Sequence, residues 1–241
     1  MPKLFIQLKY YNVMNFPVVI VNFKAYENSY GKKAIELSRE FERISLNSGV
    51  EVIIAVPDTM IYRIANEVSL PVYAQSVDSV GHGAKTGQTI IEMIKEAGAR
   101  GFLINHSEKK ERFENLINLI NSSKIEGLES IICVDSYEAI PLASLLNPTA
   151  VLIEPPELIG TGIAVSKAKP EVIERAVKEA NKVNYDKVIA GAGITSGEDV
   201  YNALRLGAKG VGVASAVMKA KKPGEALMEL IMGVKKYIEG R

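Results

Sequence analysis

A single carboxylate, Glu154, ends the apolar run V-L-I-E and is followed at once by two prolines and a glycine-containing loop. An apolar run of this kind is typical of a buried parallel strand, and α/β proteins bind ligands at the carboxyl ends of such strands. Pro155 and Pro156 restrict the backbone beyond it, whereas Gly160 and Gly162 allow the positive φ angles that a folding lid needs. The segment predicts an acid or base beneath a movable cover.

Two further polar side chains end the run V-I-V-N-F-K. Because alternate residues of a strand share a face, Asn22 and Lys24 are expected to point one way and Phe23 the other. An isolated N-x-K ending is more often a solvated lysine than a ligand-binding one. Taken alone, this pair therefore indicates a site only weakly.

The run G-F-L-I-N-H-S-E presents His106, one of only two histidines, with Asn105, Ser107 and Glu108 beside it. A lone histidine next to an apolar strand is more often structural, but the carboxyl end of a barrel strand favours catalysis. We expect a helix over residues 109–120. Its N-terminal dipole would disfavour protonation of the ring, so His106 suits the role of a neutral hydrogen-bond donor.

Short β-branched runs alternate with longer segments of helical period along the whole chain, which is typical of βα units around a parallel sheet. Eight units are counted, the number that closes a barrel. An open doubly wound sheet is the alternative. The expected strands are Val18–Asn22, Glu51–Ala55, Val72–Gln75, Gly101–Asn105, Ser130–Val134, Ala150–Ile153, Lys187–Ala190 and Gly210–Val213.

The segments between these strands carry apolar residues at spacings of three and four, so each predicted helix has a buried face. In the first helix this face comprises Ile35, Leu37, Phe41, Ile44 and Leu46. Expected N-caps are Ser136 and Ser196, the latter followed by Glu198, and expected helix ends are Gly49, Gly98 and Gly207.

Length and composition limit the class of protein. An α/β barrel of 241 residues is an ordinary single domain. The first strong strand starts near Pro17, so residues 1–15 are expected to form an extension outside the core, with the barrel over residues 16–241. Basic residues number 29 against 28 acidic ones, a net charge of +1 that provides no overall field to recruit nucleic acid or an anionic membrane.

No apolar stretch reaches the roughly 20 residues of a membrane span, and the first residues hold too short an apolar run for a signal peptide. The single cysteine, Cys133, excludes an internal disulfide and suits a reducing compartment. A cytoplasmic location is therefore expected.

Glycine-rich turns follow the seventh and eighth expected strands, as G-A-G-I-T-S-G and G-V-A-S-A. Each alone reads as an ordinary βα turn. Barrels often bind phosphate through the loops after these two strands, where small residues let backbone N–H groups approach the ligand. As a pair, the turns indicate a phosphate site.

Together these segments resemble the triosephosphate isomerase family, in its shorter archaeal-type branch. The resemblance runs from about Pro17 to Tyr237 and rests on five motifs in order: N-F-K-A-Y, N-H-S-E, E-P-P-E-L-I-G-T-G, G-A-G-I and G-V-A-S-A. It implies an isomerase that interconverts dihydroxyacetone phosphate and glyceraldehyde 3-phosphate through an enediolate, with no metal or organic cofactor.

The resemblance also implies roles for particular residues, a glutamate base with a neutral histidine being the known pattern of this family. Glu154 matches the base, His106 the electrophile that polarises the carbonyl, and Asn22 with Lys24 the substrate-binding pair. Glu108 matches a support of the lysine. The lid is matched by Ile159, Gly160 and Gly162, and the phosphate-binding amides by Gly193, Ala214 and Ser215.

Several positions depart from the family pattern. Ala190 stands where the longer branch has a tyrosine that helps to latch the lid, and Lys85 stands where a histidine usually precedes Thr86. The loop of residues 81–87 reaches a neighbouring subunit in the family, which implies a homo-oligomer, with a tetramer favoured over a dimer. His82 in that loop matches no family role and is expected to be exposed.

Three alternatives accompany this interpretation. Glu157 is the rival base, although two prolines separate it from the strand. Another phosphate-binding barrel enzyme, of the sugar-phosphate epimerase type, would share the last two loops but lack the other three motifs. A non-catalytic barrel scaffold would be free to lose its glutamate or lysine, and both are present.

Overall fold

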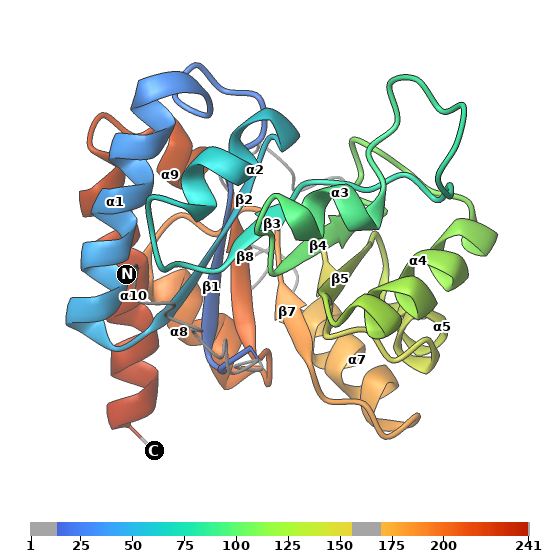
Figure 1. Ribbon diagram of the computed structural model, residues 1–241. Coiled ribbons are helices and arrows are strands. Elements are labelled where there is room, and N and C mark those ends of the chain that lie inside the picture. Colours follow the sequence, from blue (N-terminus) through green and yellow to red (C-terminus); the bar gives the residue numbers. More distant parts are fainter. Residues whose placement is uncertain (1–13, 156–169, 241) are drawn as a thin grey trace, which may run out of the picture.

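The computed structural model describes residues 14–155 and 170–240, and eight parallel strands close into a barrel in sequence order (Figure 1). Every expected strand is confirmed, with ends that differ by one residue at most. The strands are β1 (Val18–Asn22), β2 (Glu51–Val56), β3 (Val72–Ala74), β4 (Gly101–Ile104), β5 (Glu129–Val134), β6 (Ala150–Ile153), β7 (Val188–Ala190) and β8 (Gly210–Val213). The open-sheet alternative is wrong, since β1 pairs with both β2 and β8.

Helices surround the strands, with α1, α8 and α10 on one side of Figure 1 and α3, α4, α5 and α7 on the other. Their bounds are α1 (Gly31–Ser48), α2 (Asp58–Ala65), α3 (Ile91–Glu96), α4 (Phe113–Glu126), η1 (Tyr137–Ala139), α5 (Ile140–Leu145), α7 (Pro170–Asn181), α8 (Gly197–Arg205), α9 (Ser215–Met218) and α10 (Pro223–Glu239). Among the described residues, no helix is long and apolar enough to span a bilayer.

The prediction of the buried face of α1 is confirmed in the middle of the helix and wrong near its C-terminal end. Ile35, Leu37 and Phe41 are buried, whereas Leu46 is 70% exposed. Leu46 follows Phe41 by five residues, which at 3.6 residues per turn places it well over a quarter turn from the buried face. An apolar residue off the helical period therefore faces outwards.

Helix boundaries follow the expected capping residues with two changes. Ser196 caps α8 in a reciprocal box, but its partner is Asp199 rather than Glu198. Ser136 precedes the short η1 without a side-chain hydrogen bond. Gly49, Gly98 and Gly207 all have positive φ where helices end, as expected.

The helix after β4 begins four residues later than predicted, at Phe113 instead of Lys109. Asn105 adopts a left-handed φ of 63°, which ends the strand. Its side-chain oxygen then accepts the N–H of Glu111 at 3.0 Å, and its amide donates to the carbonyl of Cys133 at 2.9 Å. These bonds hold the intervening residues in a loop tied to β5.

The lower end of the barrel is filled rather than open. Met14, expected in an extension outside the core, is only 3% exposed and packs inside the barrel with Val18 and Tyr73. Its N–H donates to Glu129 at 2.7 Å, and Arg100 joins Glu129 at 2.8 Å. Met14 therefore belongs to the core, whereas Asn15 is exposed, and residues 1–13 of the expected extension lie outside the described residues.

Candidate active site

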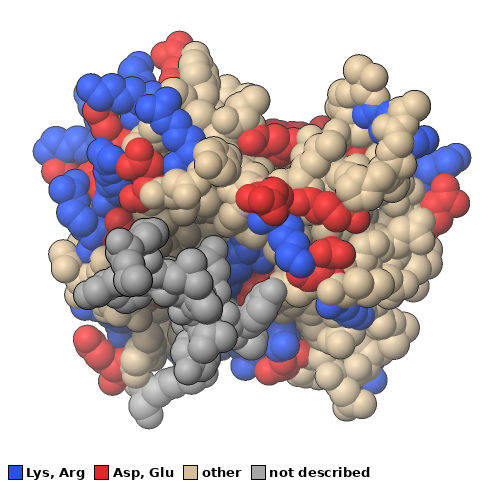
Figure 2. All heavy atoms as spheres, in the orientation of Figure 1, with Lys and Arg blue, Asp and Glu red and all other residues tan. Residues whose placement is uncertain are grey.

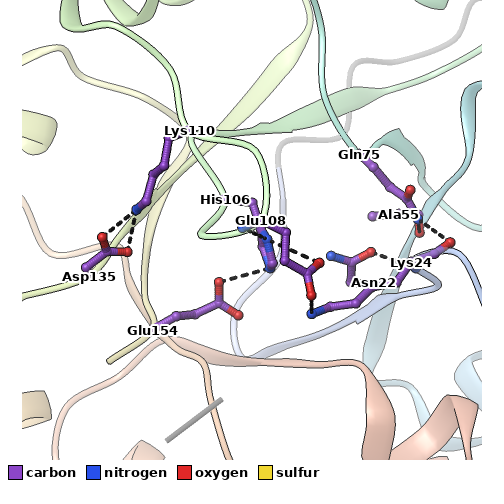
Figure 3. A network of polar contacts seen from close by, with 9 residues as sticks. All are labelled: Asn22, Lys24, Ala55, Gln75, His106, Glu108, Lys110, Asp135 and Glu154. Atoms are coloured by element: carbon purple, nitrogen blue, oxygen red, sulfur yellow. Dashed lines mark hydrogen bonds and ion pairs between the residues drawn. The ribbon is translucent and has the colours of Figure 1, made fainter. Parts of the chain in front are cut away.

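Glu154 lies just past the end of β6, inside the upper mouth of the barrel (Figure 3). Its N–H donates to the carbonyl of Val134 in β5 at 2.8 Å, which fixes the backbone from which the side chain projects. The side chain is 15% exposed, and its Oε2 lies 3.3 Å from Nε2 of His106. Within the described part of the chain, that buried oxygen accepts no hydrogen bond.

Burial raises the pKa of Glu154 to about 7, because the charged form loses its water. Lys24 opposes this effect, whereas Glu108 and Asp135 add to it. The carboxylate is thus close to half protonated at neutral pH, which suits a group that both takes and returns a proton.

Gly191, directly after β7, makes room for this carboxylate. A Cβ atom at position 191 would lie 2.5 Å from Cγ of Glu154 and 2.9 Å from Leu152. The sequence indicated this glycine only as part of a turn. A glycine is needed at position 191 because β6 and β7 lie close together there. The pattern of glycines in the sequence does not show this proximity.

His106 is held as a neutral donor. The N–H of Glu108 donates to its Nδ1 at 3.1 Å, so Nδ1 is an acceptor and the hydrogen of the neutral ring belongs on Nε2, facing Glu154. The pKa of His106 is lowered by burial first and by the charge of Lys24 second. The neutral state agrees with the expectation, but its main cause is burial and not the start of α4.

Lys24 lies beyond the end of β1, so strand alternation does not set its direction. Its backbone has a left-handed φ of 46°, an uncommon conformation for a lysine. Oδ1 of Asn22 accepts the Lys24 N–H at 3.0 Å, and Gln75 donates to the Lys24 carbonyl at 3.2 Å. Nζ then pairs with Glu108 at 2.8 Å. Gln75 was not found from the sequence, because it ends a different strand.

One pocket of about 420 Å³ contains nearly all the predicted site residues that the structure describes. Its lining includes the predicted residues Asn22, Lys24, His106, Glu108, Glu154, Gly193, Ala214 and Ser215, together with Tyr26, Cys133 and Lys219, which were not predicted. Thr86 lies outside this pocket and is exposed. His82 is exposed as expected. The predicted lid residues Ile159, Gly160 and Gly162 lie outside the described residues.

A larger hollow of about 1040 Å³ lies at the opposite end of the barrel, around Arg100 and Glu129. It contains none of the predicted site residues. Arg100 is paired there with Glu129 and with Glu51. The larger hollow is therefore not the one that holds the predicted site residues.

A second ion pair borders the upper pocket. Lys110 contacts both carboxylate oxygens of Asp135, on the far side of Glu154 from the Lys24–Glu108 pair (Figure 3). The site thus combines a carboxylate poised near neutral pH, an imidazole N–H and an ammonium. These groups can remove a proton beside a carbonyl and stabilise the oxyanion that forms. Among the described residues, no cluster of three or more His, Cys, Asp or Glu side chains is placed to hold a metal ion.

A closed parallel barrel with an acid–base pocket at the carboxyl ends of its strands defines a barrel enzyme. The family model for triosephosphate isomerase matches residues 17–233 of this chain. The chain belongs to the triosephosphate isomerase family. This membership favours the resemblance over the epimerase-type and scaffold alternatives.

Individual relatives agree with the family match. The chain is 54% identical to the triosephosphate isomerase of Metallosphaera sedula over 228 residues, which is 95% of this chain and 100% of the relative. It is 57% identical to that of Saccharolobus solfataricus over 218 residues, or 90% of this chain and 96% of the relative. A more distant relative from Methanobrevibacter smithii is 43% identical over 90% of this chain and 99% of its own.

Proposed function

We propose that Glu154 and His106 carry out the proton transfers by which this chain, an isomerase of the triosephosphate isomerase family, interconverts dihydroxyacetone phosphate and D-glyceraldehyde 3-phosphate. This reaction belongs to glycolysis and gluconeogenesis. The observation that carries the proposal is the buried Oε2 of Glu154: it accepts no hydrogen bond from a described residue and lies 3.3 Å from Nε2 of His106, and burial raises the pKa of this carboxyl to about 7. A base works best when its pKa is near the operating pH.

In this mechanism, Glu154 takes a proton from the carbon beside the substrate carbonyl and returns it to the neighbouring carbon. The Nε2–H of His106 donates to the carbonyl oxygen, where negative charge develops as the enediolate forms. Lys24 stabilises the same charge, and Asn22 supports the lysine through its backbone. No step requires charge to be held by a metal.

We assign the phosphate to the backbone amides of Gly193, Ala214 and Ser215. All three line the pocket, and Gly193 adopts a left-handed φ of 70°, a conformation that glycine adopts without steric cost. Glu108 serves as the support that holds Lys24 in place, consistent with their 2.8 Å ion pair. The lid residues Ile159, Gly160 and Gly162 complete the site by excluding water from the enediolate.

Replacement of the base tests this function. In Glu154→Gln, we expect kcat to fall by roughly 10²–10⁴-fold, because the amide cannot accept the proton, while the affinity for inorganic phosphate changes little. Turnover is measured in a coupled assay and phosphate affinity by calorimetry.

Glu157→Gln is the matched control, because Glu157 is the other carboxylate of the same segment. It should keep most of the activity. A large loss in Glu157→Gln together with wild-type turnover in Glu154→Gln would overturn the assignment and transfer the role of base to Glu157.

We further propose a homotetramer in the cytoplasm, with a tetramer favoured over a dimer. Two surfaces support assembly: residues 81–88 are all exposed on a loop that projects from the barrel, and exposed apolar side chains lie on α4 and α5 (Figure 1). Thr86 lies on the projecting loop, which supports its proposed contact with a second subunit. The cytoplasmic location rests on the single cysteine, Cys133.

A further inference from the structure

Lys219 is a charged residue of the pocket that the mechanism above does not use. It directly follows α9 and lines the same pocket as Lys24 and Glu154. Its N–H donates to the carbonyl of Ser215 at 3.0 Å, one helical turn earlier. Residues four apart on a helical turn share a side, so Lys219 stands beside the segment assigned to the phosphate.

The ammonium of Lys219 rests on an aromatic ring. Its Nζ lies 5.4 Å from the centre of the Tyr26 ring, which also lines the pocket. Asn28 donates to the carbonyl of Met218 at 2.8 Å, so the loop that carries Tyr26 is fastened to α9. Over residues 14–155 and 170–240, Lys219 forms no salt bridge with a carboxylate. Among the described residues, the Tyr26 ring is the one partner of the Lys219 ammonium, and a cation bound to a ring at an exposed site is bound weakly and can move to a stronger partner.

The charges that line the pocket show what this cation supplies. Among the described residues, two lysines and two glutamates line it besides the neutral His106: Lys24 and Lys219, and Glu108 and Glu154. Lys24 is already neutralised by Glu108 at 2.8 Å. Without Lys219, an ionised Glu154 would leave the pocket negative, which would repel a phosphate group that carries nearly two negative charges.

We propose that Lys219 is a substrate-binding residue that leaves the Tyr26 ring to pair with the phosphate group, which makes the pocket select a phosphorylated triose over an unphosphorylated one. This inference rests on the proposed phosphate position at Gly193, Ala214 and Ser215. Lysine and arginine side chains, with carboxylates among them, also gather on the side of the molecule that carries α1 (Figure 2).

The test compares Lys219→Met with Lys221→Met, which removes the same charge two residues further on, outside the pocket lining. For Lys219→Met we expect KM for glyceraldehyde 3-phosphate and Kd for inorganic phosphate to rise about tenfold, as for loss of one charge-assisted contact, with kcat changed less than about threefold. Lys219→Arg should retain most of the affinity, and Lys221→Met should change KM less than about twofold. If KM and Kd rise equally in Lys219→Met and Lys221→Met, the cause is the loss of positive charge in general and not of a specific contact. That result would overturn the proposal.

A second substrate distinguishes a phosphate contact of Lys219 from a purely structural role of its packing on Tyr26. Turnover of unphosphorylated D-glyceraldehyde should be unaffected in Lys219→Met, because the lost contact is to the phosphate. If Lys219 only packs on Tyr26, the variant should lose thermal stability and slow both substrates alike, which would also overturn the proposal.

The proposed phosphate position is checked in the wild-type protein and in Lys219→Met. In each, the chemical shift of the Ser215 amide is followed by NMR during a titration with inorganic phosphate. A shift of this amide in both proteins, with the same Kd, would refute the role of Lys219 and leave the phosphate position standing. No shift of Ser215 in the wild-type protein would refute the phosphate position itself. A shift in both, with weaker binding in Lys219→Met, is the expected result.

Discussion

Glu154 holds a carboxylate oxygen that receives no hydrogen bond from any described residue, in a pocket from which much of the water is excluded. Burial of an unpaired charge is costly, and the group responds by keeping its proton to higher pH. Ionised Glu154 is therefore a stronger base than a solvated glutamate. The same burial keeps His106 neutral, so the two groups are shifted in opposite directions by one cause.

The pH dependence of kcat/KM should report this base. Because the pKa of Glu154 is raised to about 7 and only the ionised form accepts a proton, kcat/KM should fall about tenfold per pH unit below pH 7. The lowered pKa of His106 means that the ring stays neutral above this range and adds no loss at higher pH.

The substrate phosphate also titrates, near pH 6, so kinetics alone do not identify the group. An infrared titration of the free protein, with Glu154→Gln subtracted, follows the Glu154 carboxyl directly. A midpoint near the ordinary value of a glutamate would contradict the role of burial.

The reacting residues could be located from the sequence because each lies within two residues of the end of an apolar run, as Glu154, His106 and Asn22 do. Two of their supports, unlike Glu108, could not. Gln75 contacts Lys24 across 51 residues of sequence, and Gly191 is needed only because β7 passes close to Glu154. Both depend on which strands become neighbours, and no local pattern carries that information.

The approach of β6 to β7 sets where the base stands. In Gly191→Ala, the added methyl group would lie 2.5 Å from Cγ of Glu154, so the side chain must move. Overpacking of this kind costs about 1–3 kcal/mol of stability, and a base displaced by about an ångström can lose roughly 10²-fold in rate. We expect kcat to fall far more than the small loss in melting temperature would explain.

Gly81→Ala is the matched control, because no atom lies within 4 Å of a Cβ at that exposed position. It should leave kcat and melting temperature unchanged. An equal kcat in Gly191→Ala and the wild-type protein would show that the strand spacing tolerates the methyl group and that Gly191 does not position the base.

The loop between β4 and α4 shows why a helix boundary was predicted wrongly. Residues 109–112 are polar or charged and suit a first helical turn, but the side chain of Asn105 binds the N–H of Glu111 and the carbonyl of Cys133. A long-range tie to β5 thus overrides local helix preference. The result is a loop over residues 105–112 that is hydrogen-bonded to β5 in place of the first helical turn.

The barrel as a whole was predictable because its signal repeats: eight β-branched runs alternate with helical segments, and each strand pairs with its neighbour in sequence. The burial of Met14 was not, because it depends on a hydrogen bond to Glu129 and on packing in one cluster with Tyr73, both far along the chain. Repeated local patterns thus specify the architecture, while single long-range contacts set its limits.

Assembly of barrels should depend on the exposed apolar face of α5. Leu142 and Leu145 lie three residues apart on one side of this helix, and Leu145 is 67% exposed. In the double variant Leu142→Glu, Leu145→Glu, we expect the proposed tetramer to separate into dimers, measured by light scattering after size-exclusion chromatography. Activity should persist, since neither residue lines the pocket.

Leu46→Glu is the control, because Leu46 is equally exposed but lies on α1, away from α4 and α5. It should leave the mass unchanged. A wild-type protein that is a monomer in solution, or a double variant that keeps the tetramer mass, would contradict the proposed assembly.

The filled interior of the barrel determines how substrate enters and how product leaves. Among the described residues, Met14, Tyr73 and their neighbours fill the interior of the barrel between the upper pocket and the hollow around Arg100 and Glu129. Substrate and product must therefore use the same entrance, and one triose phosphate has to depart before the next arrives. The entrance that admits the substrate also sets how fast the product can leave.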